Sequence, residues 1–149
     1  HHYCRGLQHV NYATFSARTR EERQHRHVNA VVEYDYVLDR SATDFALRPE
    51  ILTKKGESLI ALGKAPLAIG ELQRAIQLKP DYWPPYTVLS DYYKGAGNPK
   101  MAREVLEQGL SSSPDATALK RRLAELDGVK ARPAAASEPA GKKAGEAVK

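Results

Sequence analysis

Residues 49–82 read PEILTKKGESLIALGKAPLAIGELQRAIQLKPDY, and the next 34 residues, 83–116, read WPPYTVLSDYYKGAGNPKMAREVLEQGLSSSPDA. When the first stretch is shifted by 34 positions onto the second, six positions agree in size and polarity without a gap. An internal period of this length is typical of arrays in which one helical unit stacks on the next. The matching pairs are Gly56 and Ser90, Leu59 and Tyr93, Ala68 and Ala102, Leu72 and Leu106, Ala75 and Gly109, and Pro80 and Pro114.

The apolar spacing within each copy predicts two antiparallel helices. Small residues such as Gly56 and Ala68 let the two helices approach closely where they cross. Leu72 and Ala75, three residues apart, form a stripe that faces the partner helix. Pro80 ends the second helix, because proline cannot continue a hydrogen-bonded turn.

The turns between the two helices of each copy have their own signature. Residues 63–66 read GKAP and residues 95–99 read GAGNP, so glycine ends the first helix and proline opens the second. Asn98 is placed to cap the second helix of its copy.

This pattern resembles the tetratricopeptide repeat, whose period is 34 residues and whose signature alternates small and bulky residues before a closing proline. The resemblance implies an all-α solenoid of antiparallel helix pairs, with about three repeats. It also implies binding of a protein or peptide partner in a concave groove, without catalytic activity.

A third, degenerate copy precedes these two. Ala30, Tyr34 and Val37 fit its second helix, and Gly6 fits the small position of its first helix. Gly6 to Ala30 spans 24 residues where the other copies use 12, so the extra dozen either lengthen both helices or form an irregular loop near residues 14–26. The capping box of residues 19–22 (TREE) places the start of the second helix near Arg20. Phe45 and Leu47 are expected to hold the connector of residues 41–48 in place.

After Pro114, an N-cap at Asp115 and apolar residues on one helical face predict a terminal capping helix that ends at Gly128. Beyond it, Ala, Pro, Gly, Lys and Glu dominate, and such a composition cannot bury enough apolar surface to fold. The predicted divisions are a repeat domain at 1–129 and a disordered basic tail at 130–149; within the domain lie the degenerate repeat at 1–48, repeats at 49–82 and 83–114, and the capping helix at 115–129.

Charge counts argue against a broad nucleic-acid surface. The chain of 149 residues has a net charge of +5, which divides into +1 for residues 1–48, +1 for 49–114 and +3 for 115–149. A nucleic-acid site would concentrate basic residues on a folded face. Binding of RNA or another polyanion by the basic C-terminal end, with Lys120, Arg121 and Arg122, stays open as an alternative.

The sequence offers weak candidates for chemistry. His1, His2, Cys4 and His9 are the nearest approach to a metal cluster, but they lack the second pair of ligands that a zinc site takes from elsewhere in the fold. His25 and His27 lie too far along a helix from Asp35 for an acid–base pair. No phosphate-binding loop or nucleophile elbow is present in the sequence. We therefore expect no enzyme, no cofactor and no metal.

The resemblance places partner-binding residues on the first helix of each pair. Glu57 and Asp91 occupy central positions where some members of the family have basic residues that clamp a peptide carboxylate, so a basic or amide-bearing partner is favoured. The aromatic residues at 82–93 are interpreted mainly as packing between repeats. The groove is expected to include Tyr3, Leu7, Val10, Asn11, Thr53, Lys54, Glu57, Thr87, Asp91 and Lys94.

The expected function is that of a scaffold or adaptor. The overall pattern resembles bacterial repeat proteins, often exported, that help to assemble the cell envelope. Because the chain begins at His1 rather than Met, we expect an upstream segment, and the resemblance favours a periplasmic protein whose signal segment is absent here. A further alternative is an oligomerisation or regulatory module of a larger protein, which predicts an exposed apolar face beside Tyr3 and Val10.

Overall fold

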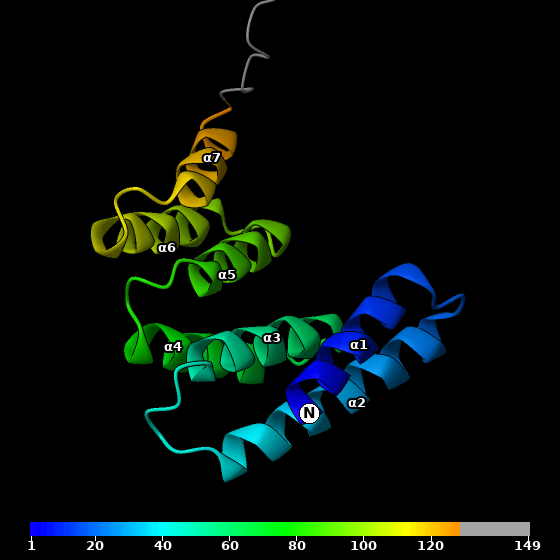
Figure 1. The fold of residues 1–149 in the computed structure, drawn as a ribbon. Coiled ribbons are helices and arrows are strands. Elements are labelled where there is room, and N and C mark those ends of the chain that lie inside the picture. Colours follow the sequence, from blue (N-terminus) through cyan, green and yellow to red (C-terminus); the bar gives the residue numbers. More distant parts are fainter. Residues whose placement is uncertain (129–149) are drawn as a thin grey trace, which may run out of the picture.

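The computed structural model describes residues 1–128, and all regular structure in that range is helical. Seven helices pack as three antiparallel pairs followed by a single helix (Figure 1). None of the described helices is both long enough and apolar enough to cross a membrane. The predicted tail at 130–149 lies outside the described residues. The helices are α1 (His2–Phe15), α2 (Arg20–Arg40), α3 (Arg48–Ala61), α4 (Ala65–Leu78), α5 (Pro84–Gly95), α6 (Pro99–Ser112) and α7 (Thr117–Leu126).

The small residues found by the repeat are points of close helix contact. A Cβ atom added to Gly56 of α3 would lie 2.7 Å from Cγ of Leu72 on α4. In the degenerate pair, Gly6 of α1 faces the ring of Tyr34 on α2, and a Cβ there would collide with that ring. The predicted crossing role of Gly56, and the alignment of Gly6 with it, are therefore confirmed.

The apolar interior has two parts. Tyr34, Ile51 and Ala75 belong to a cluster that joins the first and second helix pairs. Leu72, Tyr86 and Leu119 belong to a second cluster, which joins the second pair to the third and to α7. Each helix pair thus buries its apolar face against a neighbour, as in other stacked-repeat proteins.

The turns within the second and third helix pairs form at the glycine and asparagine residues from which they were predicted. Gly63 (φ 72°) and Gly97 (φ 75°) adopt the left-handed conformation after α3 and α5, which glycine reaches without a steric penalty. Asn98 Oδ1 accepts a hydrogen bond from the amide of Met101 at 3.1 Å, which confirms the predicted cap. The cap predicted at Asp115 is wrong, because α7 begins at Thr117 after Ala116 and has no side-chain cap.

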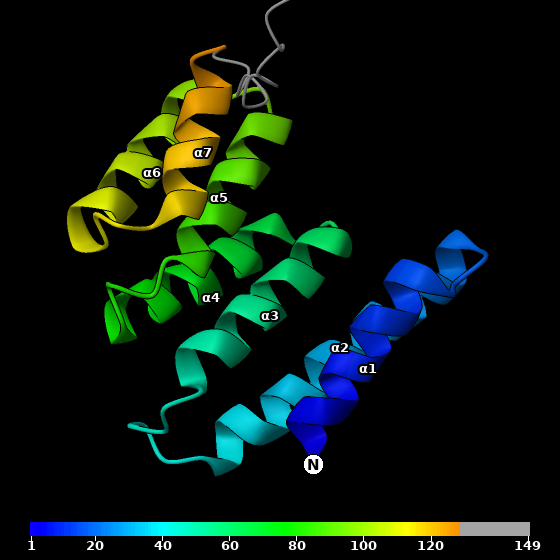
Figure 2. The same ribbon diagram turned by 45° about the horizontal axis from the view of Figure 1, so that its top comes forward.

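Most of the extra residues of the first copy lie in its second helix. Helix α2 has 21 residues, against 14 in α4 and α6, and only residues 16–19 lie between α1 and α2. Thr19 Oγ1 accepts a hydrogen bond from the amide of Glu22 at 3.1 Å, so α2 starts where the capping box predicted. The far end of this hairpin projects beyond the end of α3 (Figure 2).

The connector between α2 and α3 is held by a residue that the sequence analysis did not single out. Arg48 is 9% exposed, and its guanidinium donates hydrogen bonds to the carbonyl oxygens of Leu38 at 2.9 Å and Ser41 at 3.1 Å. Phe45 and Leu47 are 38% and 40% exposed, so the expectation that these two residues fix the connector is wrong. Instead, the buried guanidinium of Arg48 holds the connector, because it donates hydrogen bonds to the last carbonyl groups of α2.

Candidate functional site

A pocket of about 450 Å³ lies between the first helices of the second and third pairs and α7. Glu57 and Ile60 of α3 form one side, and Arg122 of α7 forms the other. The floor comes from α5, which contributes Thr87, Val88, Asp91 and Tyr92 at the spacing of one helical face. We call these seven residues the central groove.

An ion pair forms one wall of the central groove. Arg122 Nε lies 2.9 Å and 3.0 Å from the two carboxylate oxygens of Asp91, and Nη2 lies 2.8 Å from Asp91 Oδ2. This bidentate geometry raises the pKa of Arg122 above its usual value, chiefly through the hydrogen bonds to Asp91. The predicted free carboxylate at Asp91 is therefore already neutralised from within the fold.

The second central carboxylate is also paired. Lys54 Nζ lies 2.9 Å from Glu57 Oε2 and 3.2 Å from Oε1, on the next turn of α3. Both side chains are about one-third exposed, so the pair faces the solvent side of α3. The groove thus presents paired charges around a partly apolar floor rather than an acidic surface.

Two of the predicted groove residues are almost fully buried and offer little surface to a ligand. Thr53 is 1% exposed and donates its hydroxyl hydrogen bond to the Pro49 carbonyl at 2.7 Å. Thr87 is 5% exposed and donates to the Pro84 carbonyl at 2.7 Å. Thr87 lines the pocket, but both hydroxyls are used within their own helices.

The remaining predicted residues lie outside the central groove. Tyr3 and Leu7 of α1 are half-buried, and Asn11 is exposed. Tyr3 donates a hydrogen bond to Glu50 Oε1, which connects α1 to α3. Lys94, at the end of α5, is exposed, with Nζ 4.0 Å from Glu125 Oε2.

Carboxylates from α3 also affect a tyrosine next to the groove. Tyr82, in the turn before α5, is half-buried, and burial together with the negative charges of Glu50 and Glu57 raises its pKa to about 12. Its hydroxyl therefore stays protonated at neutral pH and is available as a hydrogen-bond donor.

The aromatic residues at 82–93 divide between packing and surface. Tyr86 is 1% exposed and donates its hydroxyl to the Pro80 carbonyl at 2.9 Å. Tyr93 packs against the apolar cluster of the third pair. Tyr92 lines the groove, and Trp83 is 40% exposed.

Three of the weak chemical candidates are engaged in other contacts. His2 Nδ1 is 2.5 Å from Glu33 Oε2, and His25 lies 3.1 Å from the amide of Asn29. Asp35 forms an ion pair with Lys55 at 2.6 Å. Within residues 1–128, no three His, Cys, Asp or Glu side chains are grouped so that they could hold a metal ion.

Four groove residues were missed by the sequence analysis. Val88 and Tyr92 flank Thr87 and Asp91 on α5, and their four-residue spacing is a signal that could have found them. Ile60 follows Glu57 by one turn in the same way. Arg122 had no such signal, because its partner Asp91 lies 31 residues away.

Comparison with solved structures shows the fold. The chain is similar to the first tetratricopeptide-repeat domain of Spaghetti (RPAP3), solved with the HSP90 peptide SRMEEVD bound. The TM-score is 0.55 at 15% sequence identity, over 85% of this chain and 93% of that one. No family model and no curated protein sequence matches the chain. Over residues 1–128 the fold is therefore tetratricopeptide-like, with three helix pairs plus one helix.

Proposed function

We propose that this protein is a peptide-binding adaptor, and that a segment of a partner protein lies along the central groove. The observation that supports the proposal is the pocket of about 450 Å³ between α3, α5 and α7, with an apolar floor and paired charges at its edges. Pockets of this kind bind through apolar contact and take their specificity from a few placed polar groups.

The paired charges define the chemistry of the partner. Asp91 and Glu57 are each matched by a cation of the fold, so a strongly basic peptide gains little from them. Ile60, Val88 and Tyr92 favour an apolar or aromatic side chain on the partner. Amide groups beside that anchor would hydrogen-bond to the exposed oxygens and nitrogens of the two ion pairs.

The test selects peptides from a random display library on the full chain and measures their affinity by calorimetry. The groove variant is Asp91→Arg, which places a long cation in the pocket. The matched control is Glu104→Arg on α6, which makes the same change of charge on a residue with about half of its side chain exposed. We expect Asp91→Arg to weaken binding by at least about tenfold, or about 1.4 kcal/mol, and Glu104→Arg to leave it unchanged.

Salt dependence separates this proposal from polyanion binding. An apolar anchor between neutralised ion pairs predicts an affinity that changes little with salt, whereas binding of a polyanion falls steeply. The third cation of the 120–122 run is Arg122, which is held by Asp91, and this counts against a continuous basic surface on α7. Equal loss of peptide binding in Asp91→Arg and Glu104→Arg would contradict the proposal that the peptide lies in the central groove.

The face of α1 beside Tyr3 and Val10 lacks the exposed apolar surface that the oligomerisation alternative predicts, although Phe15 at the end of α1 is 84% exposed. Its outward residues are mostly polar, with Cys4, Gln8 and Asn11 exposed, whereas Tyr3 and Val10 are half-buried against the fold. The setting in bacterial cell-envelope assembly stays an expectation from the sequence resemblance, since the structural comparison concerns the fold alone.

A further inference from the structure

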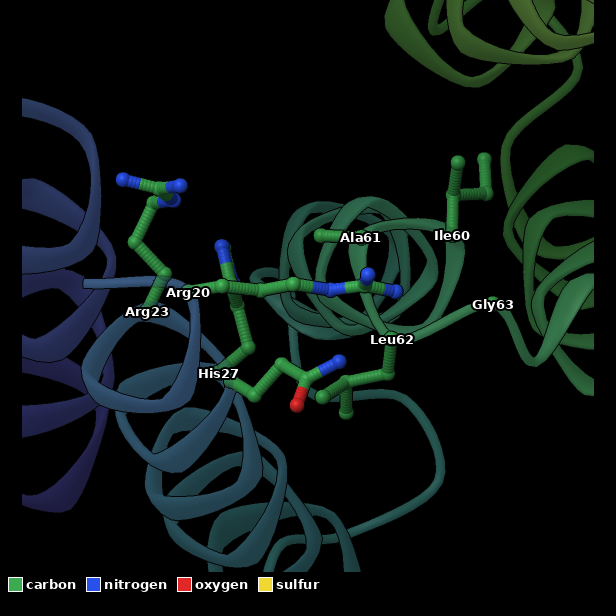
Figure 3. A pocket seen from close by; sticks show the side chains of 8 residues that line it. Arg20, Arg23, His27, Ile60, Ala61, Leu62 and Gly63 are labelled. Carbon is green, nitrogen blue, oxygen red and sulfur yellow. The ribbon is translucent and has the colours of Figure 1, made fainter.

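The projecting part of the first hairpin forms a second pocket, which shares Ile60 but no other lining residue with the central groove. It lies between the first two turns of α2 and the last turn of α3, and its volume is about 450 Å³ (Figure 3). We call it the α2–α3 notch. The extra length of the first helix pair, which departs from the 34-residue period, supplies its α2 side. The lining residues are Arg20, Arg23, Gln24, His27, Ile60, Ala61, Leu62 and Gly63.

The notch has a positive charge that the fold does not neutralise. Arg20 and Arg23 line it, and no Asp or Glu is among the lining residues. The ion pairs among residues 1–128 include neither of these arginines. Both lie in the first turn of α2, where the helix dipole disfavours cations. Their position therefore opposes the stability of the helix.

Two charged residues next to them in sequence, Arg26 and Glu22, are engaged with α1 and with the turn before α2. The guanidinium of Arg26 lies 4.1 Å from the ring centroid of Tyr12. Glu22, the nearest acidic residue facing α1, accepts hydrogen bonds from the Tyr12 hydroxyl at 2.7 Å and from the Arg18 amide at 3.1 Å. These contacts engage the Arg26 guanidinium and the Glu22 carboxylate, and within residues 1–128 they leave the Arg20 and Arg23 guanidiniums unpaired where they line the notch.

The C-terminal end of α3 offsets only part of the positive charge of the notch. Figure 3 shows the Arg20 side chain reaching from α2 toward Ala61 and Leu62, where the last carbonyl groups of α3 carry partial negative charge. A helix C-terminus is equivalent to about half of one negative charge, which is less than the two guanidinium charges of the notch. Arg23 is turned away from α3 in the same view, so it gains least from that end.

His27 adds a donor at the base of the notch. Its ring lines the pocket, and its Nδ1 atom is buried without a hydrogen-bond partner in the described part of the chain. An imidazole carries a hydrogen on at least one nitrogen, so the ring can donate to an oxygen placed between it and the arginines. Arg20, Arg23 and His27 share one face of α2, because they follow the i, i+3, i+7 spacing of a helix.

We propose that the α2–α3 notch binds a phosphate monoester on a protein partner, such as a phosphorylated serine. Once the exposed Arg23 side chain turns toward the notch, two guanidiniums and an imidazole offer more donors than the two oxygens of a carboxylate can use. A phosphate monoester has three terminal oxygens and a charge of about −1.5 to −2 at neutral pH, which matches the two unpaired arginines. The fork geometry of arginine suits bidentate contact with phosphate.

A single anionic group fits the notch better than a nucleic acid does. The free cations are confined to one helical face of two turns, and the exposed carboxylate of Glu21 lies on the same turns of α2. A chain of phosphates needs a basic track along the surface, which these residues do not provide. Binding of single-stranded RNA to the notch is therefore an alternative that the experiment below distinguishes from binding of a phosphate monoester.

The experiment titrates the full chain with N-acetyl-O-phosphoserine amide, followed by NMR on arginine side chains and backbone amides at constant ionic strength. Parallel titrations use N-acetylglutamate amide, inorganic phosphate and a short oligouridylate. We expect shifts confined to Arg20, Arg23, His27 and residues 60–63, with a dissociation constant of roughly millimolar order for so small a ligand. The phosphoserine probe should bind at least about tenfold more tightly than the glutamate probe.

The variant Arg20→Gln/Arg23→Gln should abolish these shifts, and Lys120→Gln/Arg121→Gln, which removes the same charge from α7, should retain them. Circular dichroism checks that both variants keep their helicity. Equal binding of the glutamate probe, of inorganic phosphate alone, or of oligouridylate through the same residues would overturn the proposal. Shifts that persist in Arg20→Gln/Arg23→Gln would also overturn it. The groove variant Asp91→Arg should bind the phosphoserine probe normally, which separates this site from the central groove.

Discussion

Gly6 of α1 and Tyr34 of α2 are matched in the same way as Gly56 and Leu72 in the next pair: a residue without a side chain receives a bulky one. This relationship shows that the irregular first hairpin keeps the contact of the regular repeats although α2 is longer than α4 and α6. The contact fixes how closely α1 approaches α2 and where Tyr34 enters the apolar cluster.

The first prediction concerns this contact. Gly6→Ala should destabilise the protein by about 1–3 kcal/mol, because the new methyl group overlaps the Tyr34 ring in a packed interior. Gly70→Ala is the control: Gly70 lies within α4 and a Cβ there meets nothing within 4 Å. That substitution should stabilise the protein by up to about 1 kcal/mol through helix propensity. Denaturant unfolding measures both, and equal effects would contradict the packing argument.

The second prediction concerns the connector. Arg48→Met keeps the buried aliphatic stem but removes the guanidinium that bonds to Leu38 and Ser41. We expect a loss of about 2 kcal/mol, because buried carbonyl groups lose a charged donor. Arg40→Met is the control, since Arg40 is exposed and stacks on Tyr36. An Arg48→Met loss no larger than that of the control would show that the connector is held elsewhere.

The third prediction concerns the wall of the central groove. Arg122→Gln should cost about 1 kcal/mol or less, because the ion pair with Asp91 is partly exposed and screened by solvent. The substitution should lower the magnitude of the free energy of peptide binding by more than it lowers the free energy of unfolding. The reason is that the groove loses both the charge and the fixed position of the Arg122 side chain. Arg121→Gln, a neighbouring exposed arginine, should change neither quantity. Calorimetry and thermal unfolding of the same samples provide the comparison.

The fourth prediction concerns alkaline pH. Burial and the charges of Glu50 and Glu57 raise the pKa of Tyr82 to about 12, above its value of 10.0 in the unfolded chain. A raised pKa in the folded state means that the unfolded chain loses its proton first as pH rises. The contribution of Tyr82 is therefore complete below pH 10 and is lost between pH 10 and about 12. Tyr82→Phe should reduce the fall in unfolding free energy over this interval, and Tyr36→Phe serves as a control.

The repeat was predictable because its determinants are local or lie one period apart. Gly56, Ala68 and Leu72 recur at fixed spacing, and Asn98 stands beside a proline at a helix start, so steric and hydrogen-bonding rules apply directly. The first hairpin was predicted only as two alternatives, because the count of extra residues does not say whether they extend helices or form a loop. The structure shows an extended second helix, α2.

The groove was less predictable because its charges are paired across the fold. Asp91 looks free in sequence, and only the packing of α7 on α5 brings Arg122 to it. Thr53 and Thr87 lie on the expected helices, but a rotation of one residue around a helix turns a side chain by about 100°, which is enough to bury it. The notch was hidden for a similar reason, since Glu21 and Glu22 balance the local charge count but do not line the notch.

Helix α4 belongs to both apolar clusters, with Ala75 in one and Leu72 in the other. The two halves of the array therefore share α4 as a common support, together with α3, whose Ile51 belongs to one cluster and whose Ile60 packs against the other. Hydrogen exchange should find the slowest amides in α4, because they open only when both neighbouring layers separate. A destabilising substitution in the first or third helix pair then affects one apolar cluster, whereas a charge placed in the middle of α4 disrupts both clusters together.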